Sequence, residues 1–181
     1  NQLGVFDYKP TLSELVPYID WTPFFMTWSL AGRYPAILQD EVVGDAATQL
    51  FADAQERLQW LIDDGRLGAA GVYGIWAANR LGDDDIEIFT DKDRTNRLAL
   101  LHHLRQQAPK PDDLSPNQCL SDYIATPGTA DYLGGFAVTT GINIDKILAE
   151  FPDDDYAQIM IKSLADRLAE AFAERLHALV R

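Results

Sequence analysis

Cysteine is nearly absent from this chain. Its 181 residues include one, Cys119. A single cysteine cannot form an internal disulfide framework or supply a cysteine-based zinc site. It is compatible with a reducing compartment, so the sequence favours a cytoplasmic location. A chain of this length with 47% hydrophobic residues can bury a core without covalent cross-links.

Long hydrophobic runs are missing as well. No apolar run approaches the about 18 residues that a transmembrane helix needs, and no secretory signal region opens the sequence. We therefore expect no membrane partner.

Positive charge is scarce. The chain has 15 Lys and Arg residues against 28 Asp and Glu residues, which gives a formal net charge of −13. Phosphate binding requires clustered Lys and Arg, so we expect no nucleic-acid partner. The acidic balance is compatible with a cationic small molecule or a basic protein face, and equally with a role in solubility alone.

Motifs for catalysis and for nucleotide or metal binding are not found. The glycine-rich stretches lack the spacing of a dinucleotide fingerprint or a P-loop, and no Gly-x-Ser-x-Gly segment occurs. The acidic runs GDDDIE and FPDDDY lack the alternate carboxylates of a calcium loop. We expect no catalytic residue, no metal site and no independent enzymatic activity in this chain.

Helices are predicted at three places. Apolar residues at three- and four-residue spacing predict a helix over about residues 45–64, with Asp45 as its N-cap. A short helix is expected over 143–151, capped by Asn143, and a long final helix over about 153–181.

The long final helix has two different faces, both spaced by four residues. The apolar stripe consists of Tyr156, Met160, Leu164, Leu168, Phe172 and Leu176. The charged stripe consists of Lys162, Asp166, Glu170 and Glu174. We expect the first stripe to be buried, whereas the second is read as a solvated face with Arg167 and Arg175 offsetting its repulsion.

Strands are predicted between these helices. Residues 69–81 are rich in β-branched and aromatic side chains, GDDD marks a turn, and residues 86–91 alternate, which together predict a β-hairpin. A third strand is expected to run into His102 and His103, and a further one over 134–141. Hairpins with helices grouped at the start and end of the chain predict an α+β fold with an antiparallel sheet.

One acid stands out in the stretch PYIDWTPFFMTWSL, where Asp20 is surrounded by aromatic residues. A carboxylate is costly to bury unless a partner satisfies it. Asp20 could cap a turn before Thr22, or it could bind a cation or an amine from an aromatic wall. The residues by themselves favour the turn cap.

Several segments together resemble one family. YIDWTPFFMTWSLAGRYPAIL, VYGIWAANRLGDDDIEIFTD, HHLRQQ, SDYIATPGTADYLGGFAVTTG and IKSLADRLAEAFAERLH are similar to the S-adenosylmethionine-binding activation domain of cobalamin-dependent methionine synthase. They follow the family order from about residue 5 to the C-terminus. The resemblance implies a single curved α+β domain over residues 1–181, with a bent antiparallel sheet, flanking helices and a long C-terminal helix. Residues 1–10 read as an entry arm.

The resemblance also implies a role in repairing the parent enzyme. In the family, the domain docks on the cobalamin-binding module of methionine synthase and presents S-adenosylmethionine, while flavodoxin or a similar one-electron reductase supplies an electron. Reductive methylation of cob(II)alamin then restores methylcobalamin. The cobalamin belongs to the partner module and is not expected to bind to this chain alone.

Three acids are implied at the family's functional positions. Asp20 matches the acid of the DWTPFF segment that contacts S-adenosylmethionine, and Glu170 matches a second ligand-binding position. Asp166 matches the acid that faces the cobalamin module in the docked state. A carboxylate is a suitable partner for the ligand's α-ammonium group.

The chain departs from the family pattern at its C-terminal end. The family's RPAPGY-type segment, which holds much of the ligand, follows the final helix and is not in these 181 residues. The expectation is therefore an incomplete domain whose S-adenosylmethionine binding on its own is weak or absent. The alternative is a stand-alone docking or binding module with the same fold that no longer binds S-adenosylmethionine.

Overall fold

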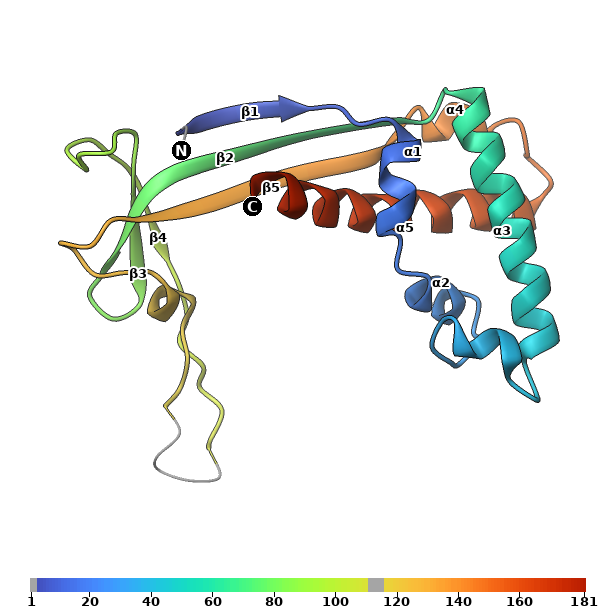
Figure 1. Cartoon of the computed structure of the whole chain (residues 1–181), viewed down its shortest axis with the longest axis horizontal. Helices are drawn as coiled ribbons and strands as arrows, with labels where there is room; N and C mark the ends of the chain where they lie inside the picture. The colour runs from blue at the N-terminus through green and yellow to red at the C-terminus, as the bar shows by residue number, and fades with distance from the viewer. Residues whose placement is uncertain (1–2, 111–115) are drawn as a thin grey trace. The chain divides into compact units, whose positions relative to one another are not determined.

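In the computed structural model of the protein, residues 3–110 and 116–181 are described (Figure 1). Within these residues five strands form one sheet: β1 (Gly4–Tyr8), β2 (Gly68–Leu81), β3 (Asp85–Phe89), β4 (Arg97–His102) and β5 (Asp131–Ile142). The α-helices are α1 (Leu12–Leu15), α2 (Thr22–Thr27), α3 (Gly44–Asp64), α4 (Ile144–Leu148) and α5 (Asp155–Val180). Short 3-10 helices are η1 (Val16–Tyr18), η2 (Ala36–Gln39) and η3 (Leu120–Tyr123).

The sheet has the predicted antiparallel character. Its strand order is β1-β2-β3-β4, and β5 also pairs with β2. The β2–β3 hairpin places Ala78 opposite Ile88, and the β3–β4 pair places Ile86 opposite Leu101. The hairpin, the third strand up to His102 and the strand β5 are thus confirmed, as is the α+β class with flanking helices and a long C-terminal helix.

The chain divides into two compact units. Unit 1 comprises Asn1–Asp7 and Val72–Ala137, and unit 2 comprises Tyr8–Gly71 and Val138–Arg181. Because β2 and β5 run through both ranges, each of these strands contributes to both units. In the part of the chain that the structure describes, we find no helix whose length and apolar character would let it cross a membrane.

Unit 1 is stabilised by an arginine after β4. The Arg105 guanidinium donates to both carboxylate oxygens of Asp122, at 2.7 and 3.0 Å, and its Nε donates to Asp84 at 2.9 Å. The Asp122 carboxylate also accepts from the backbone N–H of Cys119. These hydrogen bonds lower the pKa of Asp122 to about 2. The bonds from Arg105 have the largest effect, and the bond from the Cys119 N–H has the next largest.

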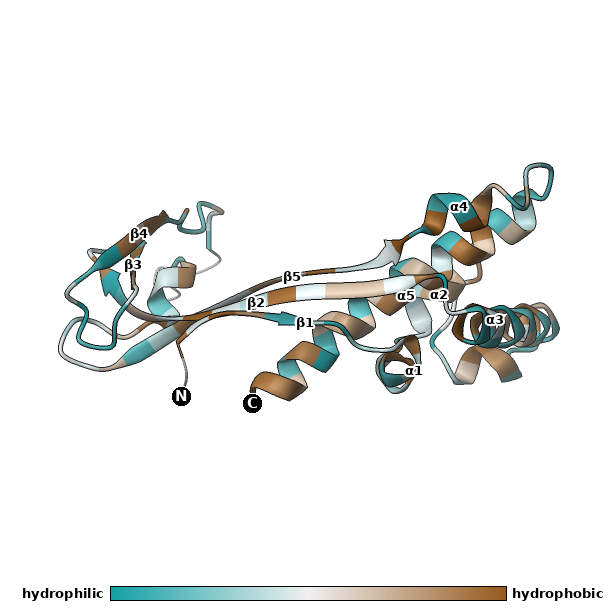
Figure 2. Cartoon of the chain, turned by 90° about the horizontal axis from the view of Figure 1, so that it is seen from above, coloured by the Kyte–Doolittle hydropathy of each residue, from teal (hydrophilic) through white to brown (hydrophobic). Residues whose placement is uncertain are grey.

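Unit 2 is built around the buried face of α5. The predicted stripe from Met160 to Leu176 is buried, and hydrophilic and hydrophobic residues alternate around α3 and α5 (Figure 2). Thr140 of β5 donates to the buried carbonyl oxygen of Ala165 at 2.6 Å, which ties this strand to the helix. Gly71 of β2 lies so close to α5 that a Cβ atom there would meet Phe172 at 2.8 Å. The strand therefore needs glycine at this point.

Some predicted details of the helices are wrong. The helix α3 begins at Gly44 with Val43 as its N-cap residue. Asp45 therefore lies in the first turn, where its negative charge interacts favourably with the helix dipole. Asn143 occupies the N-cap position of α4 with a φ of 68°, but its side chain donates to the carbonyl of Arg66 and does not cap the helix. Tyr156 is 46% exposed and does not share the burial of the apolar stripe.

The lowered pKa of Asp122 predicts that the stability of the protein depends on pH. A carboxyl whose pKa is lowered on folding adds stability above its ordinary pKa of about 4, and this contribution is lost as the pH falls. We expect Asp122→Asn to lower the melting temperature at pH 7, and the gap from the wild type to shrink between about pH 4 and about pH 2. Thermal denaturation followed by circular dichroism across this range measures the gap. A gap that is constant with pH would show that the Arg105–Asp122 pair does not carry the effect.

Candidate functional site

The segment around Asp20 joins η1 to α2 in unit 2. Asp20 is exposed, and its Oδ1 accepts a hydrogen bond of 2.9 Å from the backbone N–H of Thr22. This is the local turn bond expected from the residues alone. Among the described residues, its second carboxylate oxygen has no hydrogen-bond partner. Asp20 therefore supports the start of α2 and still presents a carboxylate to solvent.

The aromatic residues that follow Asp20 point inward. Trp21, Phe24 and Phe25 are buried. The Trp21 ring meets Phe24 edge-on at 5.4 Å and Phe51 of α3 at 5.0 Å between ring centroids. These contacts hold α2 against α3. The aromatic stretch is thus a packing element, and Asp20 is the polar group at its outer edge.

The second part of the site is a cluster of charges on α5. Arg167 is buried, with 7% of its side chain exposed, whereas the side chains of Asp166 and Glu170 are 69% and 60% exposed. The Arg167 Nη2 donates to Asp166 at 2.6 Å and to Glu170 at 2.9 Å, and its Nη1 donates to Glu170 at 2.5 Å. One buried guanidinium therefore orients both exposed carboxylates.

The electrostatics of this cluster favour the charged state of Arg167. Burial by itself would lower the pKa of the guanidinium, but the hydrogen bonds to Asp166 and Glu170 outweigh burial and raise it. The two carboxylates in turn receive a fixed positive partner on their own helix. The arrangement can hold two negative groups in a set geometry at the surface of α5.

The elements on either side of Asp20 pack against the helix that carries the charged cluster. Both η1 and α2 contact α5 within unit 2. Asp20 lies in the segment between η1 and α2, and the described hydrogen bonds do not link it to Asp166 or Glu170. As for metals, among the residues that the structure describes no three His, Cys, Asp or Glu side chains gather where they could hold an ion.

Arg167 is the member of this site that the sequence analysis did not assign. The sequence shows acids one residue before it and three residues after it, and this pattern predicts only that Arg167 offsets repulsion at the surface. The sequence does not indicate that Arg167 is buried, because a charged residue between exposed acids is normally solvated. That the helix contacts bury it is a property of the tertiary structure.

Residues 11–181 match the family described as "Vitamin B12 dependent methionine synthase, activation domain". A solved structure described as "Crystal Structure of the MetH Reactivation Domain bound to AdoHcy" is 52% identical in sequence, with a TM-score of 0.93. The match covers 100% of this chain and 56% of that one, so the chain spans little more than half the length of this relative.

The burial of Arg167 predicts how the loss of its partners affects stability. Removing both carboxylates by Asp166→Ala and Glu170→Ala leaves Arg167 buried without its partners. A fully buried pair broken in this way costs about 3–5 kcal/mol, and we expect about 2 kcal/mol here because the lost partners are hydrated. Urea denaturation measures the free energy of unfolding. Arg167→Met in the wild-type background should change it by less than about 1 kcal/mol, since the whole ionic contact is then replaced by an apolar side chain.

Two further variants test the assignment. Adding Arg167→Met to the double variant should restore most of the lost stability. Glu174→Ala, on the same stripe but outside the contacts of Arg167, should stay within about 0.5 kcal/mol of the wild type. Equal destabilisation by the double and the triple variants would show that Arg167 is not the group left uncompensated.

Proposed function

The chain belongs to the family of vitamin B12-dependent methionine synthase activation domains, and from this premise we propose that it binds S-adenosylmethionine and supports the reductive methylation of cob(II)alamin. The family match over residues 11–181 further supports the proposal that these 181 residues form one activation-domain segment, in which residues 1–10 are an entry arm.

The observation that carries the proposal is the ligand of the similar structure. That protein is bound to AdoHcy, and it is 52% identical to this chain over the chain's whole length. AdoHcy is S-adenosylmethionine without the transferred methyl group, so the two compounds share the adenosine and the amino-acid portions. A site that holds one of them presents the same charged groups to the other.

Asp20 is proposed as the acceptor for the ligand's α-ammonium group. Its carboxylate is exposed and keeps one oxygen free of protein partners among the described residues. A carboxylate–ammonium hydrogen bond is charge-assisted and about twice as strong as a neutral one. Because the other oxygen is held by the N–H of Thr22, little rotamer freedom remains to be lost on binding.

Glu170 is proposed as the second ligand-binding residue. The ligand carries an ammonium and a sulfonium, so a second carboxylate, on the helix against which η1 and α2 pack, complements Asp20 in matching its positive charges. Arg167 holds the Glu170 carboxylate through two hydrogen bonds. The geometry of the acid is therefore set before the ligand arrives, which lowers the cost of ordering it.

Asp166 is proposed to face the cobalamin-binding module in the docked assembly. It lies one turn before Glu170 on the same exposed stripe, and it shares the Arg167 guanidinium. A shared cation gives a physical route by which docking at Asp166 can influence the orientation of Glu170. In this arrangement the chain binds and orients the methyl donor on the side that faces its partner.

The chemistry itself involves groups outside this chain. With S-adenosylmethionine bound, a one-electron reductase such as flavodoxin reduces cob(II)alamin on the partner module, the methyl group passes from sulfur to cobalt, and AdoHcy remains. The cobalamin module, the reductase and the cytoplasmic location are all proposals. The expectation that these 181 residues bind the ligand only weakly stays a prediction.

The ligand assignment is tested by titration with S-adenosylmethionine up to millimolar concentration, followed by calorimetry. We expect Asp20→Asn and Glu170→Gln each to weaken binding by about tenfold or more, because each removes a negative charge proposed to face the ligand's ammonium or sulfonium group. Glu174→Gln is the matched control, since it removes a carboxylate from the same stripe of α5. Equal affinities for the wild type, Asp20→Asn and Glu170→Gln would contradict the assigned residues.

A further inference from the structure

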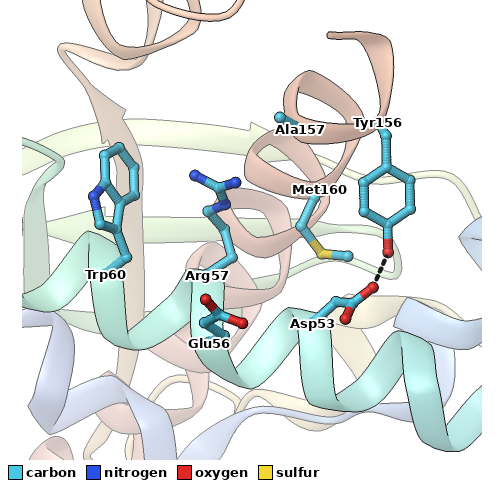
Figure 3. A pocket seen from close by; sticks show the side chains of 7 residues that line it. All are labelled: Asp53, Glu56, Arg57, Trp60, Tyr156, Ala157 and Met160. Atoms are coloured by element: carbon cyan, nitrogen blue, oxygen red, sulfur yellow. Dashed lines mark hydrogen bonds between the residues drawn. The ribbon is translucent and has the colours of Figure 1, made fainter.

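A pocket lies within unit 2, between α3 and the first turns of α5 (Figure 3). Its volume is about 230 Å³. It is lined by Asp53, Glu56, Arg57, Trp60, Tyr156, Ala157 and Met160. None of the acids assigned to S-adenosylmethionine or to docking lines it. Drug-sized ligands occupy pockets of about 300–1,000 Å³, so this one suits a smaller molecule.

The α3 side of the pocket is one continuous helix face. Asp53, Glu56, Arg57 and Trp60 are spaced by three, one and three residues, which places them on the same side of a helix. The packing of α3 against α5 brings this face opposite Tyr156 and Met160. The pocket wall therefore combines charged groups from α3 with the exposed Tyr156 side chain from α5.

Arg57 is the unusual group of this pocket. Its guanidinium lies over the rings of Trp60 and Phe151, at 5.1 and 5.0 Å from their centroids. Figure 3 shows the side chain rising from α3 between Trp60 and Met160. Stacking uses the flat faces of a guanidinium and leaves the N–H groups at its edge. Among the described residues, no hydrogen-bond acceptor meets these donors.

The two acids of the pocket differ in the hydrogen bonds that they already accept. The Asp53 carboxylate accepts from the Tyr156 hydroxyl at 2.6 Å and from Gln49 at 2.8 Å. Burial, together with this bond to Asp53, raises the pKa of Tyr156 to about 12, so the hydroxyl stays a neutral donor. Glu56 is exposed and has no ion-pair partner among the described residues. Arg57 and Glu56 are thus the two charged groups left available.

We propose that this pocket binds a small zwitterionic α-amino acid with an unbranched apolar side chain. The carboxylate of the ligand accepts from the edge of Arg57, and its ammonium donates to Glu56. Arg offers paired donors that match a carboxylate in a bidentate geometry. The ligand's side chain packs on the rings of Trp60 and Tyr156, where a thioether also gains a sulfur–aromatic contact. A zwitterion fits because it supplies both charges without adding net charge to an acidic chain.

The test uses L-methionine as the ligand, titrated to tens of millimolar and followed by NMR chemical shifts of the whole chain. We expect saturation with shifts centred on α3 and the start of α5. Arg57→Met and Glu56→Gln should each weaken binding by about tenfold or more. Asp63→Asn is the matched control, because it neutralises an exposed acid of α3 outside the pocket and should leave the affinity unchanged.

Ligand analogues separate the two contacts. N-acetyl-L-methionine lacks the ammonium, so its weaker binding should be insensitive to Glu56→Gln, whereas L-methioninol lacks the carboxylate and should be insensitive to Arg57→Met. Circular dichroism confirms that each variant is folded. An absence of saturable binding to the wild type, or an affinity that survives both Arg57→Met and Glu56→Gln, would overturn the proposal.

The effects of two variants on two ligands distinguish this pocket from the proposed S-adenosylmethionine site. Asp20→Asn should weaken AdoHcy and leave L-methionine unaffected, and Arg57→Met should do the reverse. If L-methionine binding instead depends on Asp20 and not on Arg57, the amino acid occupies the other site and the proposal for this pocket is wrong. Failure of AdoHcy binding alone would agree with the predicted weak binding by these 181 residues and would leave the proposal for this pocket unaffected.

Discussion

The burial of one face of α5 is the contact on which the whole of unit 2 depends. The helices α1, α2, α3 and α4, together with η1, all pack against it. Its apolar side chains from Met160 to Leu176 are almost fully removed from water. Burial of a large apolar side chain contributes about 1.5–3 kcal/mol relative to exposure, so this helix supplies a main part of the driving force for folding the unit.

The same packing creates both candidate sites. One side of α5 meets η1 and α2, and this brings the Asp20 segment to the helix that carries Asp166 and Glu170. The first turns of α5 meet α3, and this forms the pocket around Arg57. The lining residues of the pocket all lie on α3 and α5, whereas Asp20 lies in the short segment between η1 and α2. In both sites, polar side chains lie at the edge of a contact between helices that pack together for stability.

Arginine has a different role at each of these edges. Arg167 is buried and pairs with two exposed carboxylates, so its charge serves to orient groups of its own helix. Arg57 is stacked on two rings and keeps its donors free among the described residues, so its charge is available to a ligand. The difference lies in which neighbours the packing provides. In a chain with a formal charge of −13, Arg167 thus holds two of the many acids in place, whereas Arg57 holds none among the described residues.

The periodic patterns of the sequence were sufficient for the class of fold. Alternation predicted the β2–β3 hairpin, and four-residue spacing predicted α3, α5 and the buried stripe, because each pattern is local and reflects which side of an element meets the core. The sequence also identified Asp20 as an acid with a turn bond available to it. What it could not determine is which polar residues the core would enclose. The burial of Arg167 and the exposure of Tyr156 depend on helices distant in the chain. So does one of the two ring contacts of Arg57, with Phe151, whereas the other ring, Trp60, lies on the same helix. The tertiary structure decided these features, since the cost of desolvating a charge, and the partners that offset it, arise only when those helices meet.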